Sequence, residues 1–93
     1  MAEISRQVTI VNELGLHARA AAKLVQLASR FPVEIKLVRE DMTVNAKSIM
    51  GVLMLAAAKG TDLVITAAGD AVAAQSAIDA LANLIQERFG EER

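Results

Sequence analysis

The sequence has no cysteine, a single histidine and only two aromatic residues among its 93 positions. Without cysteine, the chain can form no disulfide, no thiolate zinc site and no cysteine nucleophile. With one histidine, a metal site would depend on carboxylates, and none of these are clustered at ligand spacing. We therefore expect a protein that holds neither a metal nor another cofactor.

Neither sign of charge predominates, since ten basic and eleven acidic residues leave a net charge of −1. The chain lacks the dense basic face of a nucleic-acid-binding protein, and it has few aromatic side chains on which bases could stack. We expect no nucleic acid among its partners.

Long hydrophobic segments are absent as well. The longest apolar run covers residues 49–58 and is interrupted by Gly51, so it is too short to span a membrane. Residues 1–6 contain no apolar segment of the kind found in signal peptides. These absences favour a cytoplasmic protein without direct membrane insertion. A single proline and no low-complexity stretch favour one ordered domain over residues 1–93.

Four segments have the pattern of β-strands. In residues 4–11 and 33–38, apolar residues alternate with polar ones, which is typical of strands with one buried face. Residues 42–45 alternate again after a polar turn, which predicts a hairpin with the preceding strand. Residues 61–67 are rich in β-branched side chains and predict a central strand.

Three segments have the pattern of helices. Apolar residues recur at helical spacing from His17 until Pro32 interrupts the pattern. Ser48 precedes a second helix, which we expect to end near Gly60. A third helix is predicted over about residues 71–88. Its apolar face consists of Ala74, Ile78, Leu81, Ala82, Ile85 and Phe89.

The resulting order, β-α-β-β-α-β-α, predicts an α+β domain with its helices packed on one face of a single sheet. Periodicity does not choose the order of strands within that sheet. The first six elements also suit a ferredoxin-like fold.

His17 is the strongest candidate for chemistry because it stands at the start of a helix. Helix N-termini expose unpaired N–H groups and attract anions, above all phosphate. Arg19 could add a fork of donors to a bound oxyanion, and Gly15 would let the chain turn sharply before the histidine. Together these residues could form a phosphoryl acceptor. The plain alternative, which spacing alone does not exclude, is a surface histidine near a helix start, the usual role of such a residue.

Two segments carry a resemblance to a known family. Residues 15–19, Gly-Leu-His-Ala-Arg, closely resemble the active-site segment of the HPr family, the histidine-containing phosphocarriers of the bacterial phosphoenolpyruvate-dependent sugar phosphotransferase system. Residues 47–52, Lys-Ser-Ile-Met-Gly-Val, look like the second signature of that family, around its regulatory serine. The two segments lie about thirty residues apart, as in the family.

The resemblance implies one fold among the alternatives. It is an open-faced β-sandwich, in which a four-stranded antiparallel sheet of order 1-4-2-3 is covered on one face by three helices. Residues 1–93 would form a single HPr-like domain.

The resemblance also implies a phosphoryl carrier rather than an enzyme with its own turnover. His17 would accept a phosphoryl group on Nδ1 from enzyme I and pass it to a histidine of an enzyme IIA. Arg19 would hold or orient that group. Ser48 would be the site of an HPr kinase/phosphorylase in bacteria that have one, although a helix N-cap explains a serine there equally well. We expect a monomer.

One residue departs from the family pattern. Ala20 stands where the family usually has proline after the arginine. Proline fixes φ in a first helical turn and has no N–H, so alanine releases a constraint and restores a donor. This departure leaves open a divergent branch that serves a regulatory phosphotransfer chain, such as a nitrogen-related one, rather than sugar uptake.

The segment after Ser48 has almost no polar face, since nine of the ten residues 49–58 are Leu, Ile, Val, Met or Ala and the tenth is Gly51. A short helix that is apolar all round exposes part of its surface in so small a domain. By the resemblance, this surface docks enzyme I and enzyme IIA partners, with Ile49, Met50 and Leu53 exposed and Lys47 at the rim. The alternative is that these apolar residues belong to the core.

Two other classes of function compete with a carrier. One is a regulatory paralogue that acts mainly through protein–protein interaction at the Ser48 segment, which retention of His17 and Arg19 disfavours. The other is a small-molecule-binding regulatory domain of ferredoxin-like type, which both motifs disfavour.

Overall fold

The computed structural model describes all 93 residues, from Met1 to Arg93. The chain forms four strands, three α-helices and one turn of 3₁₀ helix. They are β1 (Ala2–Thr9), α1 (Ala18–Ala28), β2 (Glu34–Arg39), β3 (Met42–Asn45), α2 (Ile49–Met54), β4 (Asp62–Gly69), α3 (Ala71–Gln86) and η1 (Arg88–Gly90). No helix combines the length and the apolar character that crossing a bilayer would require.

The strands form one antiparallel sheet in the order β1-β4-β2-β3. β4 lies between β1 and β2, with Leu63 opposite Val8 and Ile65 opposite Leu37. The central position of residues 61–67 and the order 1-4-2-3 are thus confirmed, and the ferredoxin-like alternative is wrong.

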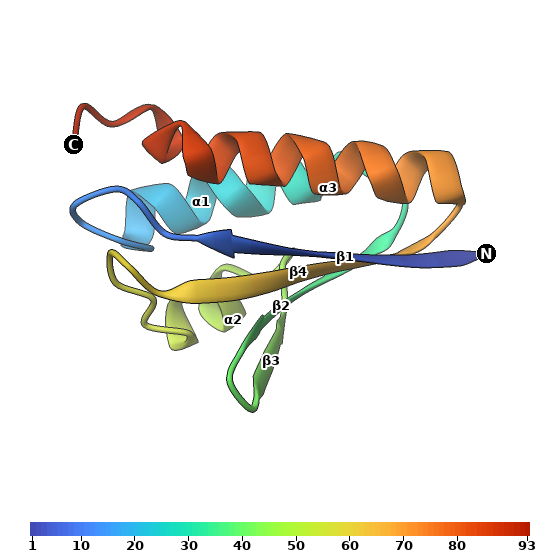
Figure 1. Cartoon of the computed structure of the whole chain (residues 1–93), viewed down its shortest axis with the longest axis horizontal. Helices are drawn as coiled ribbons and strands as arrows, with labels where there is room; N and C mark the ends of the chain where they lie inside the picture. Colours follow the sequence, from blue (N-terminus) through green and yellow to red (C-terminus); the bar gives the residue numbers. More distant parts are fainter.

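The helices leave the opposite face of the sheet open. α1 and α3 lie side by side along one face, as Figure 1 shows, and the short α2 packs against α1 and β3. The core lies between these helices and the sheet. Its largest fully buried side chains include Ile35, Leu37, Leu63, Ile65, Ile78 and Leu81.

Small residues allow the helices to approach the sheet and each other. Ala21 and Ala28 of α1 and Ala74 and Ala77 of α3 are completely buried. Since alanine has no side chain beyond its β-carbon, backbones can pack closely at these positions while larger aliphatic residues fill the space between them. The predicted apolar face of α3 is buried in full.

Two helix ends differ from the sequence prediction. α2 ends at Met54 rather than near Gly60, and Ala56 has a positive φ of 48° that a continuing helix does not allow. The Ala57 carbonyl instead accepts a hydrogen bond from Leu16 N–H at 2.9 Å. α3 ends at Gln86, and Phe89 is buried from the 3₁₀ turn that follows.

Candidate functional site

His17 is the N-cap of α1, with extended backbone at φ −74° and ψ 178°. Its Nδ1 accepts a hydrogen bond from the Arg19 N–H at 3.3 Å. The first intrahelical bond runs from Ala21 N–H to the His17 carbonyl at 2.8 Å, so the N–H groups of residues 18–20 have no intrahelical acceptor. The predicted position of His17 at an open helix N-terminus is confirmed.

Gly15 is required by the way the loop before His17 is packed. Its φ is +68°, and a β-carbon there would lie 2.5 Å from the Ala57 carbonyl oxygen. Any other residue would meet both backbone strain and a clash. The loop containing Gly15 is thereby held against the segment that follows α2.

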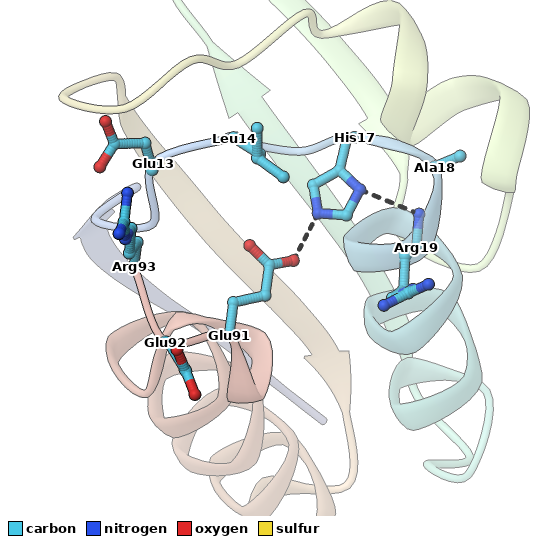
Figure 2. A pocket seen from close by; sticks show the side chains of 8 residues that line it. All are labelled: Glu13, Leu14, His17, Ala18, Arg19, Glu91, Glu92 and Arg93. Carbon is cyan, nitrogen blue, oxygen red and sulfur yellow. Dashed lines mark hydrogen bonds and ion pairs between the residues drawn. The ribbon is translucent and has the colours of Figure 1, made fainter.

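Glu91 provides a second contact to the histidine ring, which no pattern in the sequence indicated. Its Oε2 lies against His17 Nε2, although the two residues are 74 positions apart. Only 28% of the His17 side chain and 17% of the Glu91 side chain are exposed. Figure 2 shows the two side chains pointing toward each other, with Arg19 in the first turn of α1 beside the ring.

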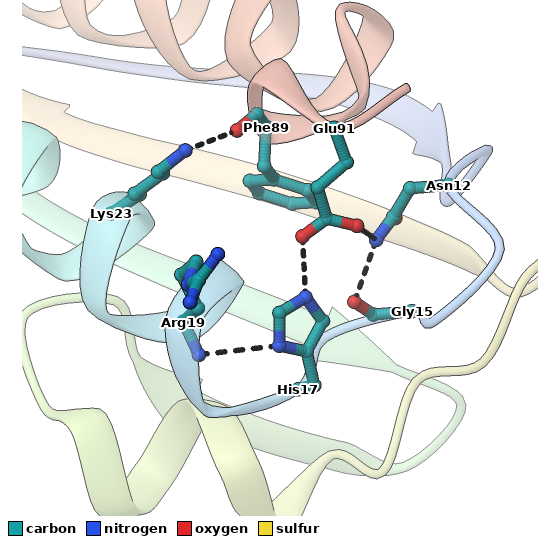
Figure 3. A network of polar contacts seen from close by, with 7 residues as sticks. All are labelled: Asn12, Gly15, His17, Arg19, Lys23, Phe89 and Glu91. Carbon is teal, nitrogen blue, oxygen red and sulfur yellow. Dashed lines mark hydrogen bonds and ion pairs between the residues drawn. The ribbon is translucent and has the colours of Figure 1, made fainter. Parts of the chain in front are cut away.

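Asn12 connects this pair to the loop. The residue is completely buried, and its Nδ2 donates to the Gly15 carbonyl at 2.8 Å and to Glu91 Oε1 at 2.9 Å (Figure 3). No pattern in the sequence set it apart from other loop asparagines. Its role follows from the tertiary contact alone.

The environment of Glu91 lowers its pKa below the ordinary value. Desolvation alone would raise the pKa, since burial disfavours the charged carboxylate. The hydrogen bonds from Asn12 and His17, together with the charges of His17 and Lys23, outweigh that effect. The carboxylate beside His17 is therefore stabilised in its ionised form.

Arg19 lies at the same site but has no partner within the chain. Its side chain is exposed and, together with His17 and Glu91, lines an open depression of about 750 Å³. No carboxylate or carbonyl of the protein accepts a hydrogen bond from its guanidinium. Five N–H donors thus remain free for an oxyanion bound near His17.

Ser48 is the N-cap of α2, as the sequence predicted. Its Oγ accepts a hydrogen bond from Gly51 N–H at 3.1 Å. The neighbouring Lys47 donates from Nζ to the Phe31 carbonyl at 2.7 Å. Lys47 is therefore half-buried and tied to the segment that follows α1, and its place at the rim of a docking surface stays a prediction.

The apolar residues of α2 divide between core and surface. Val52 and the capping residue Leu55 are buried, whereas Met50 is 73% exposed and Leu53 is 36% exposed. Ile49 and Met54 are also exposed. We call Ile49, Met50, Leu53 and Met54 the α2 patch. The expected exposure of the first three is confirmed, and Met54 joins them.

Comparison with known proteins gives consistent results. The family profile described as "PTS HPr component phosphorylation site" matches residues 4–87. The sequence is 52% identical over 88 residues to phosphocarrier protein HPr of Cupriavidus necator, covering 95% of this chain and 97% of that protein. It is 45% identical over 91 residues to phosphocarrier protein NPr of Shewanella violacea, covering 98% of both.

A solved structure agrees with the sequence comparisons. The crystal structure of HPr-C-His from Thermoanaerobacter tengcongensis is similar with a TM-score of 0.88 at 43% identity, and all of both chains is covered. The similarity thus extends over the sheet, the helices and both motif segments.

Proposed function

The chain belongs to the HPr family of phosphocarrier proteins, and on this premise we propose that His17 accepts a phosphoryl group from phosphorylated enzyme I and passes it to a histidine of an enzyme IIA. The observation that carries the proposal is the position of His17 Nδ1 at the open N-terminus of α1, beside the unpaired Arg19. The proposal includes a cytoplasmic location and action as a monomer.

The two nitrogen atoms of the His17 imidazole have different neighbours, and this difference suits the ring to accept a phosphoryl group on one of them. Nδ1 faces an N–H donor and Nε2 faces a carboxylate. The 3.3 Å bond to Arg19 N–H is long, so little energy is lost when the Nδ1 lone pair turns to a phosphorus atom. The phosphoryl oxygens would then replace Nδ1 as acceptors for the first N–H groups of α1, where the helix dipole favours negative charge.

Arg19 completes the proposed anion site. Its guanidinium can donate two parallel hydrogen bonds to phosphoryl oxygens, and its charge offsets that of the incoming group. The role of the chain is to hold and hand over this group, so it is a substrate in one transfer and a donor in the next.

Incubation with enzyme I and phosphoenolpyruvate tests the proposal. We expect a mass gain of about 80 Da, the mass of one phosphoryl group, which is lost in acid and maps to His17. His17→Ala should gain no mass while keeping the melting temperature of a folded domain. A stable phosphate on another residue, or the same gain in His17→Ala, would contradict the carrier mechanism.

A regulatory, nitrogen-related phosphotransfer chain is the second candidate for the pathway. Two observations favour it: Ala20 stands where the family usually has proline, and one relative is the phosphocarrier NPr of Shewanella violacea. Rates of transfer from a sugar-type and a nitrogen-type enzyme I, measured side by side, distinguish the pathways. The faster donor identifies the chain that this carrier serves.

A further inference from the structure

We propose that Glu91 is a positioning residue for phosphoryl transfer. Its carboxylate keeps the proton of His17 on Nε2 and stabilises the positive charge that the ring gains when Nδ1 attacks phosphorus. The inference rests on the proposed function of His17 and concerns a residue that lies outside both sequence motifs.

The contacts of the ring define its tautomer. A carboxylate can only accept, so the Nε2 atom that faces Glu91 Oε2 must carry a proton. Nδ1 faces the Arg19 N–H, which can only donate, so Nδ1 must present its lone pair. In the neutral ring, the nucleophilic lone pair therefore points to the open helix end, where a phosphoryl group would be received.

The C-terminal segment is built to hold Glu91 at this place. Arg88 and Phe89 both have positive φ values, 60° and 55°, which are rare for residues other than glycine, and Gly90 follows at 80°. Such conformations persist only where surrounding contacts enforce them. The buried Phe89 ring anchors the turn, and Lys23 Nζ donates to the Phe89 carbonyl at 2.6 Å.

Further hydrogen bonds hold the residues that follow Glu91, and they also hold the Glu91 carboxylate itself. Glu13 N–H donates to the Arg93 carbonyl at 3.0 Å, which ties the end of the chain to the loop before His17. Asn12 Nδ2 donates to Glu91 Oε1, and through its second proton to Gly15 (Figure 3). One buried amide therefore sets the carboxylate relative to the loop that carries the histidine.

The transfer step shows where the carboxylate acts. The Nδ1 lone pair of His17 attacks phosphorus, the bond between phosphorus and the donor group of phosphorylated enzyme I breaks, and its electron pair returns to that donor group. The His17 ring keeps its Nε2 proton throughout, so the ring gains one positive charge as the new N–P bond forms. Glu91 Oε2 lies against that proton and stabilises the charge as it develops.

The test compares Glu91→Gln with Glu92→Gln. Both remove one negative charge from the same segment, but Glu92 is exposed and its carboxylate makes no hydrogen bond to His17. In Glu91→Gln, an amide N–H must face either Asn12 Nδ2 or His17 Nε2, so one of the two hydrogen bonds is lost. We expect the rate of acceptance at saturating enzyme I to fall roughly tenfold in Glu91→Gln, with KM unchanged, and to stay at the wild-type value in Glu92→Gln.

Nitrogen-15 NMR of the unphosphorylated protein gives a readout that does not depend on transfer. At alkaline pH, where an imidazole is neutral, the wild type should show a protonated Nε2 with a downfield, exchange-protected proton and an unprotonated Nδ1. In Glu91→Gln that proton should move upfield and exchange faster, because a neutral amide oxygen accepts more weakly than a carboxylate, and in Glu92→Gln it should keep the wild-type signal. A protonated Nδ1 in the wild type, or equal rates in both variants, would overturn the inference. Failure of the wild type to become phosphorylated on His17 would instead contradict the proposed function.

Discussion

At the scale of single residues, groups from opposite ends of the chain meet around His17. The N-terminus of α1 supplies N–H donors, Arg19 supplies charge, and Glu91 supplies an acceptor for Nε2. Of these, the sequence pointed to His17 and Arg19, because they lie two positions apart at a helix start. Glu91 is one of eleven acidic residues and had no feature to set it apart.

Arg19→Ala should slow phosphoryl transfer about a hundredfold, because one positioned donor to developing charge contributes roughly 3 kcal/mol to a transition state. The fold should be unaffected, since the guanidinium forms no contact within the chain, and binding to enzyme I, which we assign to the α2 patch, should change little. Rapid-quench measurement of His17 phosphorylation at matched enzyme I concentrations checks the rate. Arg30→Ala, which removes an exposed charge near the other end of α1, is the control. Equal rates in the two variants would remove Arg19 from the mechanism.

At the scale of elements, α2 combines a structural cap with an exposed apolar surface. Ser48 satisfies the Gly51 N–H at the start of the helix, and the α2 patch begins with the next residue. Methionine side chains adapt to partners of different shape, which suits a surface that docks both a donor and an acceptor protein. Docking at the α2 patch and modification of Ser48 both remain predictions.

Met50→Glu should weaken association with enzyme I by more than tenfold, because a charge in an apolar docking surface must be desolvated and loses its contacts. The fold should be retained, since Met50 is 73% exposed. Val72→Glu is a matched control, because Val72 is 76% exposed at the start of α3 and lies outside the patch. Titration calorimetry with enzyme I measures both. Equal affinities in the two variants would exclude Met50 from the interface.

Ser48→Asp should keep the melting temperature within a few degrees but sharply reduce transfer from enzyme I. Aspartate can still cap α2, and a negative charge interacts favourably with a helix N-terminus. That charge would nevertheless have to be desolvated when the adjacent α2 patch docks. Ser48→Ala should show the reverse, with a loss of about 1 kcal/mol in stability and unchanged transfer. An aspartate variant that accepts phosphate at the wild-type rate would contradict regulation through Ser48.

At the scale of the whole molecule, the C-terminal segment closes the fold onto the loop before His17. Hydrogen bonds from Asn12, Lys23 and Glu13 reach residues 89–93 across most of the chain length. The contacts that hold Glu91 beside His17 favour its ionised form, so they also link the free energy of unfolding to the ionisation of Glu91.

Stability should consequently depend on the ionisation of Glu91. The pKa of this carboxyl is lower in the folded chain than in the unfolded chain, so the unfolded state binds more protons as the pH falls. The stabilisation is fully present above the ordinary carboxyl range, about pH 4.3, and is lost as the pH falls through the lowered pKa. Urea unfolding should show the wild type to be more stable than Glu91→Gln near neutral pH, with the difference shrinking in acid. A difference that does not change with pH would contradict this linkage.

The sequence alone determined the elements and the local part of the site. Alternation located the strands, helical spacing located α1 and α3, and Ser48 marked the start of α2, because each signal depends on residues within a few positions of one another. His17 and Arg19 could be found in the same way. The resemblance to a known family was needed to choose the strand order, since alternation says which face of a strand is buried but not which strand lies beside it.

Tertiary structure decided where α2 ends, which of its side chains are exposed and which carboxylate contacts His17. α2 stops at Met54 because the backbone after it bonds to the Leu16 loop, and its apolar side chains divide between core and surface according to what α1 and β3 cover. Glu91 reaches His17 because three consecutive residues with positive φ, residues 88–90, turn the chain back after α3. Local periodicity encodes burial, but it does not encode which distant carboxylate a turn will bring to a given histidine, because that depends on packing across the whole fold.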